Sequence, residues 1–182
     1  MSVDGSGPVF LEGEEWQAYF RDFQHSAFRL EVQQTYTMPA EAESVRGFLS
    51  GEPVPPGFNA SWHETVRGHA AAGRTMTRAK VVRRPLTDYS RYLFEWCIPG
   101  NVAAGEDYRM VDLTDSPGLG LGLGLPDQDF WLFDESIVVH LNYRVDGTQS
   151  GRELISDPDI SAYRAWRDLA LEHAVPFHDF PV

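Results

Sequence analysis

The stretch Asp129-Phe-Trp-Leu-Phe-Asp134, followed closely by Ile137-Val-Val-His-Leu-Asn-Tyr143, decides the fold of this chain. Successive side chains of a strand point to opposite faces, so the four apolar residues between the two acids cover both faces of the first strand. Such a strand is typical of a sheet that is covered on both sides. The acids and Ser136 between the two stretches suit a tight turn. The sequence therefore predicts a central hairpin near 129–144.

Length and composition predict one folded domain. A chain of 182 residues is long enough to bury most of its apolar surface, and 13% of its residues are aromatic. The first residues are small and polar, so we expect a flexible leader over 1–12 and a single domain over 13–182. The leader has no basic and apolar stretches of the kind that form a signal peptide.

The net charge argues against some classes of binding partner, and the cysteine content indicates the cellular compartment. The net charge of −12 repels phosphate backbones and anionic lipids, which argues against direct binding to nucleic acid or to a membrane surface. No apolar run approaches the length that spans a bilayer. Cys97 is the single cysteine, so an internal disulfide is impossible and a cytoplasmic location fits best.

Hydrophobic periodicity outside the hairpin predicts alternating helices and strands. Five helices are expected, over about 14–24, from Pro39 to Gly51, from a cap at Asn59 or Ser61 to Gly73, after a Thr87 cap, and after Asp157-Pro158. Strands are expected over 28–36, 75–83 and 107–113. This order predicts an α+β fold, in which helices pack on a mixed sheet of about five or six strands.

The glycine–leucine repeat at 118–125 is compared with a phosphate-binding loop. Such a loop ends in Gly-Lys-Ser/Thr and opens a helix, whereas this repeat ends in Leu125-Pro126-Asp127 and precedes a strand. An irregular loop is the favoured interpretation, and leucines that cover a pocket are the alternative.

Metal and cofactor sites are not predicted. His63 and His69 are six residues apart, which turns one by about 240° from the other around a helix, whereas the zinc helix motif needs a spacing of four. Two polar residues of a helix surface are the simpler interpretation.

Arg78 and Lys80 are the strongest candidate binding residues. They share a strand face with Met76 and Val82, and a buried cation needs a carboxylate partner, which Glu106, Asp129 or Asp134 could supply at the strand ends. A structural ion pair or a solvated strand face is one interpretation. The other is a polar pocket for a small anionic or zwitterionic ligand, with walls formed by Trp131 and Tyr89.

Catalytic motifs are not recognisable. Cys97 lies beside the apolar positions of its helix, where a buried thiol is the usual state. His25, His140, His173 and His178 have no paired motif, and the chain has no Gly-x-Ser-x-Gly elbow.

Five segments resemble an uncharacterised family of actinobacterial proteins, domain of unknown function number 6879. The resemblance covers about residues 14–177 and implies no activity; its members often sit in genomes near helix-turn-helix regulators. The segments are Phe28-Arg-Leu-Glu31, Pro85-Leu-Thr-Asp-Tyr89, Asn101-Val-Ala-Ala-Gly-Glu106, Asp129-Phe-Trp-Leu-Phe-Asp134, and Tyr163-Arg-Ala-Trp166 with Ala170.

A more distant likeness is to truncated phospholipase-D-like sensor domains. The order of a basic strand, a helix, an acid-x-Arg strand at Asp107-Tyr-Arg109 and an Asp-rich hairpin is similar to theirs. Active members of that superfamily use a His-x-Lys pair, and here Arg78 stands two residues before Lys80. The likeness implies a binding pocket that has lost its catalytic histidine.

Two hypotheses of function follow. The first is a non-enzymatic accessory or regulatory protein that acts through protein contact or senses a small ligand, and its partner could be a basic helix-turn-helix regulator. The second is an enzyme that acts on a small anionic substrate held by Arg78 and Lys80, with Glu106 or Asp134 as acid–base.

Overall fold

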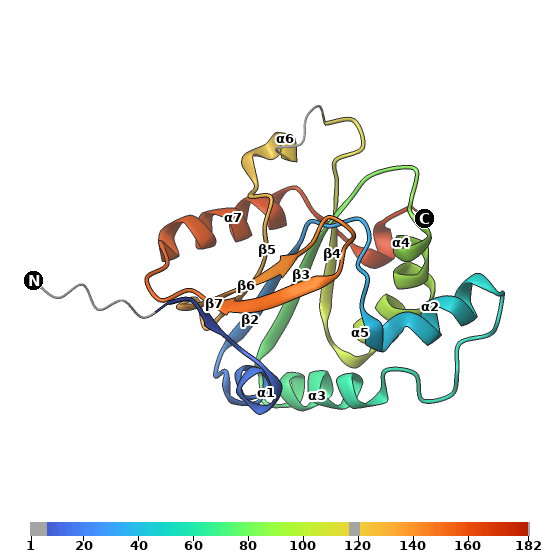
Figure 1. The fold of residues 1–182 in the computed structure, drawn as a ribbon, viewed down its shortest axis with the longest axis horizontal. Helices are drawn as coiled ribbons and strands as arrows, with labels where there is room; N and C mark the ends of the chain where they lie inside the picture. The colour runs from blue at the N-terminus through green and yellow to red at the C-terminus, as the bar shows by residue number, and fades with distance from the viewer. Residues whose placement is uncertain (1–6, 117–120, 182) are drawn as a thin grey trace, which may run out of the picture.

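A computed structural model describes residues 7–116 and 121–181, which form one domain with a mixed sheet between helices (Figure 1). The described strands number eight, in the order β1-β7-β6-β5-β2-β3-β4-β8, whereas five or six were predicted. Their bounds are β1 Val9–Phe10, β2 Ser26–Glu31, β3 Thr75–Val82, β4 Asp107–Asp112, β5 Asp129–Phe133, β6 Ile137–Tyr143, β7 Gln149–Leu154 and β8 Val175–Pro176.

The additional strands lie at the edges of the sheet and have weak sequence patterns. β1 and β8 contain two residues each, and β7 reads Gln-Ser-Gly-Arg-Glu-Leu, without alternating apolar residues. Pairing with neighbours defines all three, because β1 pairs with β7, β7 with β6, and β8 with β4. The predicted leader thus contains β1.

The predicted central hairpin is present. β5 lies between β6 and β2, is antiparallel to both, and is buried at every residue. Asp134 and Glu135 turn the chain with positive φ angles of 48° and 55°, a conformation that aspartate tolerates better than most residues. On the other side of β2, the strands β3 and β4 run parallel to it.

Helices cover both faces of the sheet, with α7 on one face and α1 and α3 on the other (Figure 1). Along the chain, α1 Gly13–Asp22 precedes β2, and α2 Ala42–Leu49 and α3 Ala60–Ala71 lie between β2 and β3. The helix α5 Ile98–Ala104 lies just before β4. The remaining elements are α4 Asp88–Tyr92, a π-helical turn at Leu93–Cys97, α6 Leu121–Gly124, α7 Ile160–Glu172, and 3₁₀ turns at Pro39–Glu41 and Phe177–Asp179. None of the helices within the described ranges is long and apolar enough to cross a membrane.

The helix ends agree with the sequence in one place and differ in another. The Thr87 side chain accepts a hydrogen bond from the Ser90 N–H at 3.1 Å, which confirms the predicted cap of α4. The prediction that Asp157 caps the last helix was wrong, because Asp159 accepts from the Ala162 N–H and α7 begins at Ile160. In the glycine–leucine repeat, α6 ends at Gly124, and residues 118–120 lie outside the described residues.

The two faces of the sheet differ in chemistry. The face under α7 is apolar and includes Phe28, Leu30 and Leu132. The opposite face has two separate apolar clusters, one around Phe20 and Trp131 and the other formed by α4, α5 and neighbouring segments. Charged side chains occupy the sheet between these clusters, and they form the candidate site.

Candidate functional site

Strand register brings the charged side chains onto one face of the sheet. Arg29 of β2 lies opposite Trp131 of β5 on one side and opposite Arg78 of β3 on the other. Two residues further along the β2–β3 pair, Glu31 lies opposite Lys80. We use the name charged strip for Arg29, Glu31, Arg78, Lys80, Glu106 and Asp129.

Ion pairs connect five of the six residues of the charged strip. Arg78 Nε lies 2.6 Å from Glu106 Oε1, and Arg78 Nη1 lies 2.8 Å from Glu31 Oε1. Arg29 lies 3.3 Å from Glu31 Oε1 and 3.5 Å from Asp129 Oδ2. The two arginine side chains are 16% and 13% exposed and the three carboxylates at most 3%, so acids and guanidinium groups compensate each other in a nearly dry environment.

Hydroxyl and backbone groups complete the coordination of two acids. Tyr108 donates its hydroxyl to Glu31 Oε2 at 2.9 Å, and Tyr36 donates to Asp129 Oδ2 at 2.6 Å. The Val32 N–H also donates to Asp129 at 2.8 Å. These bonds fix both carboxylates in place on the sheet.

Burial and neighbouring charge shift the pKa values of the acids in opposite directions. Burial alone raises the pKa of Glu31, but Arg29, Arg78 and Lys80 lower it more, so that it falls to about 2. For Asp129 burial dominates and raises the pKa, although Arg29 and Tyr36 act against it.

Lys80 is completely buried beside these acids. Its ammonium donates to the Gln33 carbonyl at 2.9 Å and lies 5.2 Å from the centre of the Tyr36 ring. Burial lowers its pKa, with Glu31 and Asp129 acting against the shift. Lys80 is therefore the fully buried cation of the charged strip.

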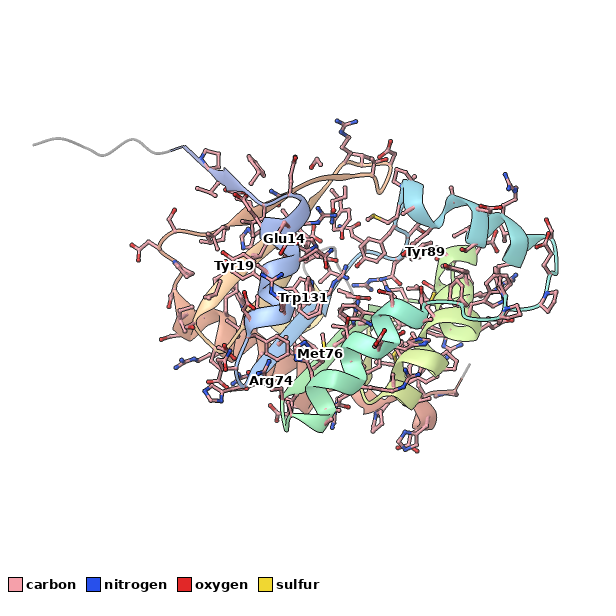
Figure 2. The ribbon with its side chains drawn as sticks, turned by 90° about the horizontal axis from the view of Figure 1, so that it is seen from below. Glu14, Tyr19, Arg74, Met76, Tyr89 and Trp131 are labelled. Atoms are coloured by element: carbon pink, nitrogen blue, oxygen red, sulfur yellow. The ribbon has the colours of Figure 1, made fainter. Side chains whose placement is uncertain are left out.

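A cavity of about 330 Å³ lies over the charged strip. This volume suits a metabolite-sized ligand. Figure 2 looks onto this face and shows Trp131 next to α1, with Tyr89 farther toward α2. The lining residues include Arg29, Glu31, Arg78 and a ring of aromatic side chains: Trp16, Phe20, Tyr36, Trp62, Tyr89, Tyr108, Trp131 and Tyr143.

Edge-to-face contacts between aromatic rings, and cation–π contacts between an arginine and two of these rings, stabilise the aromatic wall of the cavity. Phe20 lies 5.0 Å from Trp131 and 5.5 Å from Trp62, between ring centres, in edge-to-face geometry. The Arg78 guanidinium lies 5.2 Å from the centres of both tryptophan rings. The α1, α3 and β5 side chains are thus packed into one rigid wall.

Six of the seven predicted ligand-binding residues come together at this place. Arg78, Glu106, Asp129 and Lys80 belong to the charged strip, and Trp131 and Tyr89 line the cavity. Tyr89 donates its hydroxyl to Glu41 at 2.6 Å.

Asp134, the seventh predicted residue, lies away from the charged strip and this cavity. Its carboxylate accepts hydrogen bonds from the backbone N–H groups of Gln24, His25 and Ser26 at 2.8, 2.7 and 3.1 Å. These bonds lower its pKa against the effect of partial burial. Asp134 follows the end of β5 remote from Asp129 and fastens the turn to the segment before β2.

The sequence analysis missed Arg29, Glu31 and Trp62 as site residues. Arg29 and Glu31 alternate with apolar residues, a pattern typical of a half-buried strand whose polar face meets solvent. The usable signal was that two neighbouring strands, β2 and β3, each place two charges on one face. Trp62 stands on a helix whose distance from the strip depends on tertiary packing.

The cysteine and the two histidines of this region are buried or in contact with neighbouring side chains. Cys97 lines the cavity, and burial raises its pKa to about 12, so the thiol stays protonated. His63 is 3.1 Å from Asn101 Oδ1, and His69 packs on Phe23 with ring centres 4.2 Å apart. Within residues 7–116 and 121–181, no group of three or more His, Cys, Asp or Glu side chains is arranged to hold a metal ion.

Three buried polar atoms among the described residues lack a hydrogen-bond partner: Arg29 Nε, Trp62 Nε1 and Glu106 Oε2. Arg29 and Trp62 both line the cavity. Arg29 Nε still lies 3.3 Å from Glu31 Oε1 in an ion pair, so the donor of the cavity wall that stays without an acceptor is Trp62 Nε1.

Comparison with known proteins identifies a family. Among solved structures, the chain is similar to Nuc from Salmonella typhimurium, a phospholipase D family member, with 10% identity and a TM-score of 0.47, over 93% of this chain and 98% of that one. No curated protein matches the sequence. The family model of a domain of unknown function, DUF6879, matches residues 14–181. The chain therefore belongs to the DUF6879 family.

Proposed function

We propose that this chain is a non-enzymatic accessory or regulatory protein that senses a small ligand in the cavity over the charged strip. The observation that carries the proposal is the cavity itself, about 330 Å³ in volume, with an aromatic lining and a charged floor. Small-molecule sites in proteins combine such an apolar wall with a few fixed polar groups.

The state of the polar groups favours binding over chemistry. A general acid or base must be free to exchange a proton with its substrate. Glu31 and Asp129 are each held by an arginine and by hydrogen bonds, and the Cys97 thiol is protonated. These groups are suited to holding a ligand in one orientation.

The alternative is an enzyme for a small anionic substrate, and it has weaker support. Two carboxylates already balance the charge of Arg78, and Lys80 has no contact with solvent. Of the two proposed acid–base residues, Glu106 pairs with Arg78 and Asp134 caps a turn away from the cavity.

A thermal-shift screen of the whole chain against a metabolite library tests the proposal. A ligand at 100 times its Kd adds about 2.7 kcal/mol, which raises the Tm of a domain of this size by about 5–10 °C. Trp62→Leu changes the cavity wall and is expected to abolish the shift. Trp166→Leu is the matched control, because Trp166 packs against the core under α7 on the opposite face.

Two results would overturn the proposal. One is a library without any ligand whose shift depends on Trp62. The other is chemical conversion of the bound ligand, so each hit is incubated with the protein and recovered for mass spectrometry. Recovery of the unchanged compound is the expected outcome.

A further inference from the structure

We infer that the ligand of this cavity is an aromatic molecule without net charge, either neutral or zwitterionic. The inference rests on the proposed function and adds the chemical class of the ligand. It follows from the charge balance of the site, from its aromatic walls and from an unsatisfied donor of the wall, Trp62 Nε1.

The charges around the cavity balance each other. Arg29, Glu31, Arg78, Glu41 and Arg152 line the cavity. The remaining members of the charged strip lie directly behind this lining, where Glu106 pairs with Arg78, Asp129 pairs with Arg29, and Lys80 is fully buried. Together they give four basic side chains, Arg29, Arg78, Lys80 and Arg152, and four acidic ones, Glu31, Glu41, Glu106 and Asp129. A ligand with net charge would lose its hydration without finding a spare opposite charge, which is costly in a buried site.

The net charge of the whole chain acts against anions in particular. A net charge of −12 disfavours the approach of a free anion from solvent. A carboxylate that is accompanied by an ammonium group on the same small molecule does not meet this repulsion. The charge argument therefore selects neutral and zwitterionic molecules.

Aromatic side chains line the cavity from both sides. Trp16, Phe20 and Trp62 come from α1 and α3, whereas Tyr89 and Tyr143 come from α4 and β6. A flat ring fits between such walls and gains contact area and ring–ring interactions there. The aromatic lining therefore predicts that the ligand contains a ring.

Polar atoms of the cavity wall indicate which hydrogen-bonding groups the ligand has. Trp62 Nε1 is a buried donor without an acceptor, which calls for an acceptor atom on the ligand. Glu41 accepts from Tyr89 and is a carboxylate within the lining, so it can also accept from a donor of the ligand. An acceptor at one place and a donor at another is the pattern of a zwitterion or of a neutral amide-like molecule.

Four indole compounds that share one ring and differ in charge test the inference. They are indole, which is neutral, L-tryptophan, which is a zwitterion, indole-3-acetate, which is an anion, and tryptamine, which is a cation. Isothermal titration calorimetry with the full chain gives each Kd. We expect L-tryptophan or indole to bind at least about tenfold more tightly than both charged compounds, a difference of about 1.4 kcal/mol.

Matched variants assign the binding to the cavity. Trp62→Leu is expected to weaken the tightest compound at least about tenfold, and Trp166→Leu is expected to leave its Kd unchanged. Binding that Trp62→Leu leaves intact in a folded variant would overturn the inference.

The other outcomes separate failure of the inference from failure of the proposed function. Tightest binding of indole-3-acetate or tryptamine overturns the charge argument but leaves a small-ligand protein. A non-aromatic library compound whose shift depends on Trp62, together with no binding of indole compounds, overturns the aromatic class in the same way. If neither the indole compounds nor the library gives a ligand, both the inference and the proposed function fall.

Discussion

Arg78 pairs with two carboxylates that have almost no contact with solvent, Glu31 and Glu106. Replacing such a network by apolar groups can be neutral, but removing one member leaves buried charge without a partner. Arg78→Met is therefore expected to lower the free energy of unfolding by about 3–5 kcal/mol in urea titrations. The double variant Arg78→Met/Glu106→Gln should regain part of this loss, because the buried charge of Glu106 is then absent, whereas Glu31 keeps its ion pair with Arg29.

The neighbouring pair of Arg109 and Asp107 provides the matched control. Its atoms are 2.9 Å apart, but the two side chains are 34% and 44% exposed. Arg109→Met should cost about 0–1 kcal/mol, as exposed ion pairs do. Equal losses for the two arginine variants would contradict a role of Arg78 in compensating buried charge.

Glu31 and Asp129 are expected to give opposite pH dependences of stability. The pKa of Glu31 is about 2 in the folded chain, below its ordinary value, so the unfolded chain binds more protons as the pH falls from about 5 toward 2. This group therefore stabilises the fold above that window, and its contribution is lost within it. Asp129 has a raised pKa when folded, so its contribution declines as the pH rises through that value.

Urea titrations between pH 2.5 and 6 would measure both effects. Glu31→Gln should flatten the acid loss of stability relative to the parent chain, and Asp129→Asn should steepen it, because the compensating contribution is removed. The comparison uses the slopes against pH, since both substitutions also change hydrogen bonds. Slopes that change in the same direction for the two variants would contradict the assigned pKa shifts.

At the scale of secondary structure, Asp134 connects the β5–β6 turn to the start of β2. Its carboxylate satisfies three backbone N–H groups that β-strand pairing leaves open. Asp134→Ala should cost about 1–3 kcal/mol of stability, because those donors lose their acceptor. Asp134→Asn keeps an acceptor and tolerates the positive φ, so it should cost less.

Ligand affinity separates this structural role from a role in the site. Asp134 belongs to a different region from the cavity lining, so Asp134→Ala should leave the Kd of any cavity ligand within about twofold when the protein is folded. A tenfold loss of affinity would return Asp134 to the site and contradict the geometry.

Elements with a strong local pattern were predictable from the sequence, and elements defined by pairing were not. β5 is apolar on both faces, which only the interior of a sheet accommodates. β7 has a glycine and charged residues, and its place follows from hydrogen bonds to β6. The same distinction holds in the site, where Arg78 was detectable among apolar neighbours but Arg29 was not, because its burial depends on helices that are remote in the sequence.

At the scale of the whole molecule, one face of the sheet forms the apolar core and the other holds the candidate site. The face under α7 is a continuous apolar core. On the opposite face, the apolar residues form two clusters, and the charged strip and the cavity lie between them. A ligand that fills the cavity would contact α1, α3 and the α4–α5 segment together, so it would couple these helices without disturbing the core under α7.

The net charge of −12 predicts the kind of protein partner that a regulatory chain would find. An acidic surface steers toward basic proteins, such as a helix-turn-helix regulator, and the attraction weakens as the Debye length falls from about 10 Å at 0.1 M salt to about 3 Å at 1 M. Pull-down from native lysate with the full chain should therefore retain a basic protein at 0.1 M NaCl and release it at 1 M. The same acidity predicts no mobility shift of duplex DNA by the chain alone. Retention that is insensitive to salt, or a direct DNA shift, would contradict recognition through net charge.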